Sequence, residues 1–292
     1  MSEGRIAVLE RRGVVAVGGP DAETFLNDLV TADISRASPG QAVFAGLLTP
    51  QGKILFDFIV FSDGDRFLFD LPRALAPDFV KRLGFYKLRA KVTVEDISAE
   101  TRVLAVWGPE GVRHIDGVAA PDPRLATLGW RMIVPADQPP VLAGFAPATE
   151  ADYDAHRIPL GIPEGGIDFA FGDAFPHDAD MDQIGGVDFG KGCYIGQEVV
   201  SRMQHRGTAR RRFVIAQADG PLPAAGTEVT AGGKPLGTLG ASAGGTGLAL
   251  LRLDRAKEAI DAGTPIAAGD AVLALALPGW ATFGWPAAAD KD

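Results

Sequence analysis

Residues 191 to 202 read Lys191-Gly192-Cys193-Tyr194-Ile195-Gly196-Gln197-Glu198-Val199-Val200-Ser201-Arg202. This stretch holds the only cysteine of the 292-residue chain, and it surrounds that cysteine with glycines, an amide and side chains of both charges. Core packing does not require such a mixture, because buried positions favour apolar side chains. The interpretation of fold and function therefore starts here.

The cysteine is expected in a turn that leads into a helix. Val187-Asp188-Phe189 is typical of the end of a strand, and the spacing from Ile195 to Met203 predicts a helix. The unpaired N–H groups at the start of a helix and the charge of Lys191 both favour a thiolate. We therefore expect Cys193 to be a reactive or ligand-forming thiol, although an isolated cysteine is more often a small buried apolar residue.

The residues around the cysteine are expected to shape its site. Glycines without a Cβ allow backbone or ligand to approach closely, and Glu198 and Arg202 are spaced to pair on one face of the helix. No metal site is expected. The expected site consists of Cys193 as the functional thiol and, around it, of Lys191, Gly192, Tyr194, Gly196, Gln197, Glu198 and Arg202.

Other chemistries for the thiol fit the sequence less well. A Cys/His hydrolase needs a histidine base, and none of the four histidines stands in a recognisable local motif. A tetrahedral zinc site needs regular ligand spacing, which is also absent. The four histidines are His114, His156, His177 and His205.

Two further segments resemble ligand loops without matching them. Asp178, Asp180 and Asp182 alternate as in a calcium loop, but Gln183 and Phe189 stand where that loop needs glycine and glutamate. We expect a solvated loop there. The glycine-rich residues 237 to 247 have no lysine in the P-loop position, so hairpin turns explain them better.

An arginine cluster follows the opening stretch. Arg210, Arg211 and Arg212 come directly before the first strand expected in the last domain, and guanidinium groups there would suit carboxylates or phosphates. A solvated strand end fits equally well. Because the net charge is -9, a polyanion such as tRNA would need this local patch, and we expect any tRNA contact to be weak or indirect.

The first half of the chain alternates short strands with helices. Residues 6–9 and 14–17 have the pattern of a hairpin, and residues 42–48 and 53–61 predict a second hairpin that turns at Gly52. Helices are expected after Asp21 and over residues 74–85. This order indicates an antiparallel α+β fold, not a doubly wound parallel sheet.

The second half of the chain has a different pattern of predicted elements. A helix is expected over residues 150–157, followed by a long irregular segment over residues 161–190, which favours a functional role. After Arg212, five short strands and a helix near residues 254–262 predict a small β-barrel or sandwich. We therefore expect an α+β region over residues 1–206 and a β-barrel domain over residues 207–292.

The composition of the chain indicates where in the cell the protein is located. The hydrophobic content of 47% and the charged content of 22% are those of an ordinary soluble globular protein. One cysteine cannot form an internal disulfide, and the N-terminus lacks the pattern of a signal peptide, so we expect a cytoplasmic protein. No apolar run approaches the roughly 20 residues that span a bilayer, so no membrane contact is expected.

A family resemblance rests on these residues. Residues 191–198, with Arg202 following, resemble the signature of the YgfZ-type folate-binding proteins, relatives of the glycine-cleavage T-protein that act in iron–sulfur cluster assembly or repair. Residues 22–33, 49–57 and 157–163 and the glycine-rich last domain also resemble segments of that family in the same order. The resemblance covers most of the chain.

This resemblance implies a three-lobed, GcvT-like α+β architecture. Two entwined α+β lobes and a C-terminal β-barrel would surround a channel that takes tetrahydrofolate. Cys193 would support [4Fe–4S] proteins, and the partners would be folate and iron–sulfur client or assembly proteins. The implied function is that of a tetrahydrofolate-binding accessory protein.

The chain departs from the T-protein at two places. Neither Asp70 nor Asp78 falls where the T-protein has the acidic residue that assists chemistry at folate, and its Arg-x-Glu is replaced by Arg157-Ile158-Pro159. Both departures weigh against the second hypothesis, a tetrahydrofolate-dependent aminomethyl or one-carbon transferase. A third hypothesis is a non-enzymatic scaffold that binds a protein or tRNA through the arginines.

Overall fold

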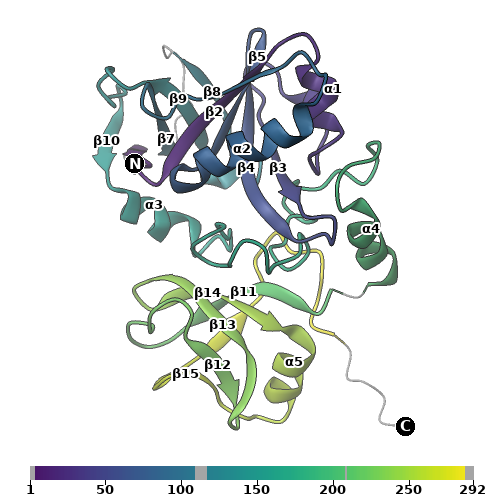
Figure 1. Cartoon of the computed structure of the whole chain (residues 1–292). Coiled ribbons are helices and arrows are strands. Elements are labelled where there is room, and N and C mark those ends of the chain that lie inside the picture. Colours follow the sequence, from purple (N-terminus) through teal and green to yellow (C-terminus); the bar gives the residue numbers. More distant parts are fainter. Residues whose placement is uncertain (1–3, 109–116, 208, 287–292) are drawn as a thin grey trace. The chain divides into compact units, whose positions relative to one another are not determined.

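The computed structural model describes residues 4–108, 117–207 and 209–286 (Figure 1). The chain divides into two compact units, and one unit combines Met1–Tyr153 with Ile184–Gln197. The other combines Asp154–Gln183 with Glu198–Asp292. The segment that carries the cysteine therefore returns to the first unit after the chain has left it. The expected division at residue 206 stays a prediction.

The first unit contains an antiparallel sheet whose helices cover its apolar side. Phe58, Phe69 and Phe79 stack with ring centroids 5.0–5.3 Å apart and join strands to helix α2. The predicted hairpin at Gly52 and both predicted helices are confirmed. In order, the strands are β3 (Val43–Leu48), β4 (Ile54–Asp63), β5 (Arg66–Pro72), β2 (Arg12–Gly18) and β6 (Thr93–Asp96), and the helices are α1 (Ala22–Asn27) and α2 (Ala76–Lys87).

A second five-stranded sheet completes this unit. Its pairs are antiparallel except that β1 runs parallel to β10, and β2 of the first sheet packs against β7. In order, the strands are β10 (Phe145–Ala148), β1 (Gly4–Val8), β7 (Thr101–Trp107), β9 (Trp130–Pro135) and β8 (Val118–Pro121). Short 3-10 turns occur at Ile34–Arg36, Arg73–Leu75 and Ala126–Leu128.

The first predicted hairpin was wrong. Strands β1 and β2 both form, but β1 pairs with β7 and β10 while β2 pairs with β5 and β6. The chain passes from one sheet to the other between them. Local alternation predicts that a strand exists, whereas its pairing depends on partners far away in the sequence.

A buried chain of charges links the two sheets. The guanidinium of Arg12 on β2 donates to Asp70 on β5 at 2.6 Å, and Arg131 on β9 donates to the other oxygen of Asp70 at 3.2 Å. Arg131 also donates to Asp122 at 3.4 Å, and Arg124 donates to Asp122 at 2.7 Å. All five side chains are at least 92% buried. Each charged group loses its hydration on burial, and the ion pairs with its neighbours compensate for that loss.

Asp122 shows how strong this pairing is. Burial by itself raises the pKa of Asp122, but the charges of Arg124 and Arg131 outweigh it and lower the pKa from 3.8 to about 2. Because the pKa is lower in the folded state, Asp122 stabilises the fold above pH 3.8, and this contribution is lost as the pH falls toward 2.

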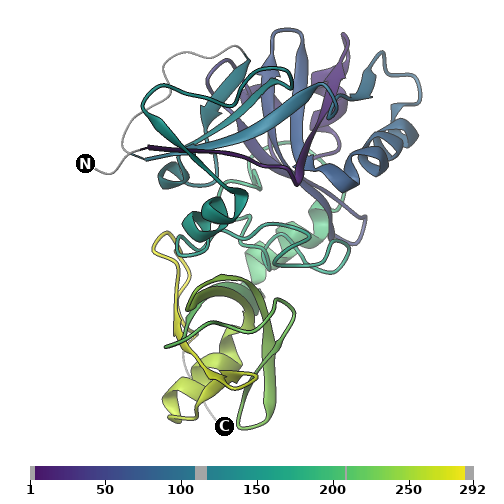
Figure 2. The same ribbon diagram turned by 90° about the vertical axis from the view of Figure 1, so that its left-hand side faces the viewer.

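The second unit contains a β-barrel. Its strands curve around an apolar core that helix α5 helps to close, as the green-to-yellow part of Figure 2 shows. The predicted strands and helix of this domain are confirmed. In order, the strands are β16 (Ala271–Val272), β15 (Ile266–Ala268), β12 (Glu228–Ala231), β13 (Lys234–Ala243), β14 (Thr246–Arg252), β11 (Arg211–Gln217) and β17 (Ala274–Ala276), and α5 is Leu253–Asp261.

The segment between α3 and α4 is irregular, as predicted. Helix α3 (Glu150–Arg157) ends before it, and helix α4 (Gln197–Arg206) follows it. Within the described ranges, no helix is both long enough and apolar enough to cross a membrane.

The charge chain gives a stability prediction. Replacing Arg131 by methionine should lower the free energy of unfolding by about 3–5 kcal/mol, because it leaves Asp70 and Asp122 buried without a shared partner. Urea unfolding measures this change. The control is Arg66→Met, which removes an exposed pair with Asp63 and should change the free energy by less than about 1 kcal/mol. Equal effects of the two substitutions would contradict the structural role of the chain.

Candidate functional site

The cysteine motif lies in an extended segment before α4. Tyr194 is buried, and Ile195 packs against the apolar core of the first unit. Gly192 and Cys193, which lie between Lys191 and Tyr194, are exposed. The side chains that follow the thiol thus anchor the segment, and the thiol itself is exposed to solvent.

Lys191 anchors this segment. Its Nζ donates three hydrogen bonds, to the carbonyl oxygens of Asn27 at 2.8 Å, Val30 at 2.7 Å and Ala32 at 3.0 Å. These carbonyls lie at and after the end of α1, where helix geometry leaves carbonyl groups without partners. An ammonium group with three donors satisfies all three. Lys191 therefore fixes the start of the motif to a stretch more than 150 residues earlier in the chain.

All three hydrogen-bond donors of the Lys191 ammonium group thus bind backbone carbonyl oxygens. Burial lowers the pKa of Lys191 to about 8, against the opposing effect of Asp33, Asp188 and Asp28. The expectation that the charge of this ammonium favours a thiolate at Cys193 stays a prediction, and its three hydrogen-bond donors are all used by carbonyl oxygens. Lys191 positions the motif.

Thr31 is a second anchor, which the sequence did not reveal. It is fully buried, its hydroxyl donates to the carbonyl of Gly186 at 2.6 Å, and the N–H of Gly46 donates to that hydroxyl at 2.8 Å. The N–H of Asp188 donates to the carbonyl of Thr31 at 2.9 Å. Residue 31 lies in a segment that resembles the family, and only its contacts identify its role.

Gly196 shows why the motif needs a glycine. Its φ is +82°, and a Cβ there would lie 2.6 Å from the carbonyl oxygen of Thr49 and 3.1 Å from Cα of Gly52. The motif therefore packs directly on the β3–β4 hairpin. At Gly192, by contrast, φ is not positive and a Cβ would meet open space. Close approach, expected at every glycine of the motif, is confirmed at Gly196 and not required at Gly192.

Cys193 lies further from the helix than expected. Helix α4 begins at Gln197, four residues later, and the influence of the dipole falls off within the first turn. No described histidine forms a hydrogen bond to Cys193, and His114 lies outside the described residues. The described residues also contain no group of three histidine, cysteine or acidic side chains that could hold a metal. What the site offers is one exposed thiol.

The charged α4 residues of the motif face solvent, whereas Val200 is buried. Glu198 and Arg202 are both exposed, and within the described residues no ion pair joins them, so the expected pair does not form. Gln197 is half-buried, and its N–H donates to the carbonyl of Tyr194. These side chains are available to a ligand or partner.

Two arginines of the cluster, Arg211 and Arg212, pair with the aspartate loop in the second unit, whereas Arg210 is exposed. Arg212 donates to Asp180 at 3.1 Å and to both oxygens of Asp182 at 2.5 and 2.9 Å. Arg211 donates to Asp178 at 2.7 Å. The expectation of a solvated aspartate loop was wrong, and the carboxylates that suit these guanidinium groups come from the chain itself.

The histidines of the second unit have structural positions. His177 is buried and its Nε2 lies 3.1 Å from Oε1 of Gln204, while burial lowers the pKa of His177. His156 is half-buried on α3 and His205 is exposed near the end of α4.

Of the residues compared with the T-protein, Asp70 and Arg157 form buried ion pairs and Asp78 does not. Asp70 belongs to the buried charge chain, and Asp78 is exposed on α2. Arg157 is fully buried and donates to Asp154 and Asp168, both at 2.8 Å. Acid–base chemistry at a folate would have to disrupt the pairs of Asp70.

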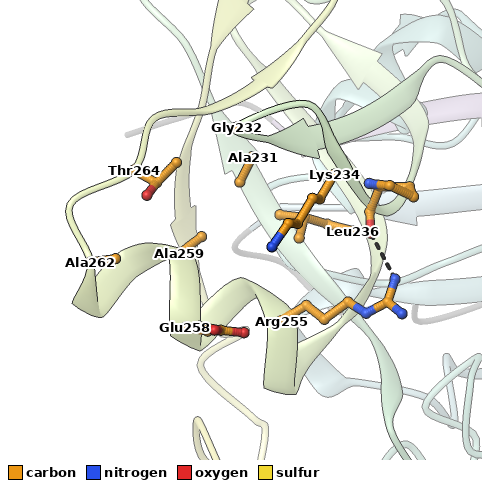
Figure 3. Close-up of a pocket in the computed structure, with 10 residues that line it drawn as sticks. Ala231, Gly232, Lys234, Leu236, Arg255, Glu258, Ala259, Ala262 and Thr264 are labelled. Carbon is orange, nitrogen blue, oxygen red and sulfur yellow. Dashed lines mark hydrogen bonds between the residues drawn. The ribbon is translucent and has the colours of Figure 1, made fainter.

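Cavities occur in both units of the described structure. A cavity of about 420 Å³ in the first unit is lined by Arg36, Phe44, Asp122, Val187 and Phe189, among others, and so adjoins the segment before the motif. Another, of about 690 Å³, lies between α5 and the β12–β13 hairpin of the barrel, where Arg255 donates to the carbonyl of Pro235 at 3.0 Å (Figure 3). No residue of the motif lines the barrel cavity.

The motif gives a matched pair of substitutions. Gly196→Ala should lower the free energy of unfolding by about 2 kcal/mol or more, because the added Cβ is strained at positive φ and collides with backbone at Thr49. Gly192→Ala should change it by less than about 0.5 kcal/mol. Thermal or urea unfolding of both variants provides the comparison. Similar behaviour of the two would mean that the motif does not pack on the hairpin as described.

Known protein families match both parts of the chain. Residues 9–136 match the GCVT N-terminal domain, and residues 210–283 match the C-terminal β-barrel domain of CAF17. A solved aminomethyltransferase T of the glycine cleavage system from Bartonella henselae superposes with a TM-score of 0.73 over 94% of this chain and 85% of that chain, at 17% identity. The expected GcvT-like α+β fold with a C-terminal barrel is thereby confirmed.

Curated relatives cover nearly the whole chain. The iron–sulfur cluster assembly factor IBA57 of Mus musculus is 35% identical, over 96% of this chain and 85% of its own. The Homo sapiens protein of the same name is 34% identical, over 95% and 84%. These relatives carry the name IBA57, not YgfZ. They are described as mitochondrial, and this finding contradicts the predicted cytoplasmic location.

Proposed function

The chain belongs to the family of the iron–sulfur cluster assembly factors named IBA57, and on that premise we propose that it acts in iron–sulfur cluster assembly through the thiol of Cys193. One observation carries the proposal: the only cysteine of the chain is exposed, on a segment anchored on one side by the hydrogen bonds of Lys191 and on the other by the packing of Gly196. Such a segment keeps the thiol in a fixed place without enclosing it.

The surroundings of the thiol indicate how it acts. A thiolate is a good ligand for iron–sulfur clusters, but a cluster needs several ligands. The described residues supply no further cluster of ligands beside Cys193. We infer that Cys193 acts together with ligands of a partner protein, so that the clients or assembly proteins complete the site.

The expected site residues divide into two groups under this proposal. Lys191, Tyr194 and Gly196 position the segment through hydrogen bonds and packing. Gly192, Gln197, Glu198 and Arg202 remain on the side that a ligand or partner can reach. The second group contributes to binding, and the first contributes to stability and to the placement of the thiol.

We further propose that tetrahydrofolate binds to the chain as a ligand and that it is not a substrate for aminomethyl transfer. The support for folate is the GcvT-like fold. The argument against transfer is that Asp70 is fully buried and pairs with both Arg12 and Arg131, so its carboxylate is already engaged and does not offer a proton acceptor to a folate. The scaffold hypothesis loses support too, because Arg211 and Arg212 bind aspartates of their own chain.

A cellular assay tests the role of the thiol. In cells that lack their own homologue, the wild-type chain should restore the activity of a [4Fe–4S] enzyme, and Cys193→Ser should restore less than about a tenth of it, since a hydroxyl is a poor iron ligand. The control is Arg66→Met, an exposed position outside the motif. Malate dehydrogenase, which has no cluster, should be unaffected. Full restoration by Cys193→Ser would refute the proposal.

Calorimetry tests the ligand separately. Tetrahydrofolate should bind the wild-type chain and Cys193→Ser with affinities within about threefold of each other, because the thiol is exposed and is not needed to bury a ligand. No heat of binding with the wild-type chain would exclude folate and leave the role of the thiol intact. Binding that disappears in Cys193→Ser would place folate on the thiol itself.

A further inference from the structure

The exposed side of helix α2 and the turn after it carries an excess of positive charge. Within the described ranges no ion pair engages any of these side chains, although acidic residues outnumber basic ones by 37 to 28 in the chain. Unpaired cations grouped on an acidic protein create a local field of opposite sign. The side chains are Lys81, Arg82, Lys87, Arg89 and Lys91.

Two large apolar side chains stand among these cations. Phe85 is 64% exposed and Leu88 is 90% exposed. Lys81 and Phe85 are four residues apart on α2 and therefore lie on the same side of the helix, and Leu88 is the first residue after it. We call Lys81, Arg82, Phe85, Leu88 and Arg89 the α2 surface; α2 itself is labelled in Figure 1.

Leu88 is exposed at the expense of backbone strain. The N–H of Ala90 donates to the carbonyl of Lys87 at 2.7 Å, which closes a turn with Leu88 at its second position. The φ of +38° and ψ of -98° at Leu88 are near those of a type II′ turn, where glycine is preferred. The protein thus keeps a leucine at a glycine position and buries almost none of it.

Gly84 is the opposite case. It lies within α2, is exposed, and a Cβ at this position would meet nothing within 4 Å. Glycine inside a helix is less stable than alanine, and packing within the chain does not require it here. Because no side chain projects from Gly84, the surface next to Lys81 and Phe85 leaves room for the backbone of another polypeptide.

From these observations we propose that the α2 surface docks an acidic amphipathic segment of a partner protein. The carboxylates of the segment pair with Lys81, Arg82 and Arg89, its apolar side chains cover Phe85 and Leu88, and its backbone passes over Gly84. A short segment meets only this patch, whereas a nucleic acid or an anionic membrane would also meet the acidic remainder of the chain. The proposal does not depend on Cys193 or on folate.

A defined peptide tests the proposal. The probe is a fluorescent helical peptide with glutamate on one face and leucine on the other, and its binding is followed by anisotropy. Lys81→Glu with Arg89→Glu, and separately Phe85→Ser with Leu88→Ser, should each weaken binding about tenfold or more. The control is Lys257→Glu with Ile260→Ser, which alters a cation and an exposed apolar residue on α5 and should change binding less than about twofold.

Leu88→Gly separates docking from folding. It should raise the thermal unfolding temperature, since glycine accepts the turn without strain, and at the same time weaken peptide binding. The proposal is overturned if the wild-type chain does not bind the peptide, or if the α2 variants bind as tightly as the control. It is also overturned if oligouridylate RNA or phosphatidylserine-containing vesicles bind as well as the peptide and lose binding in the same variants.

Discussion

The buried charges of the first unit are the interaction on which its architecture depends. Arg131 pairs with Asp70 of one sheet and with Asp122, so the second sheet cannot move away from the first without leaving a carboxylate unpaired and dry. Such groups specify an arrangement more strictly than apolar packing does, because a displaced apolar side chain still finds contacts. The same device recurs in the second unit, where Arg212 binds Asp180 and Asp182.

On this framework the cysteine motif combines rigidity with exposure. Lys191 satisfies three carbonyl groups after α1, and Gly196 lies against the β3–β4 hairpin. Between these two points Tyr194 is buried and Ile195 packs on the core, whereas Gly192 and Cys193 are exposed. Exposure suits the proposed function, since a buried thiol could not share a ligand sphere with a second protein.

The sequence predicted local structure and the identity of the motif, but not the contacts that hold it. Periodicity located α2, α3 and the strands of the barrel, because each depends on neighbouring residues. The partners of Lys191 lie 159–164 residues away, and those of Arg212 lie 30–35 residues away. No local pattern shows which carbonyl groups a lysine binds or which carboxylates an arginine binds. The misplaced β1–β2 hairpin has the same origin.

Because the chain has one cysteine, the central claim can be tested by chemistry on the wild-type protein. Iodoacetamide should alkylate the exposed Cys193 and leave the fold unchanged, as circular dichroism would verify. The decisive measurement is the reactivation of a purified [4Fe–4S] apo-enzyme by the untreated and the alkylated chain, in a reaction containing iron, sulfide and the assembly proteins. The account predicts reactivation by the untreated chain alone. Equal reactivation by the alkylated chain would contradict it.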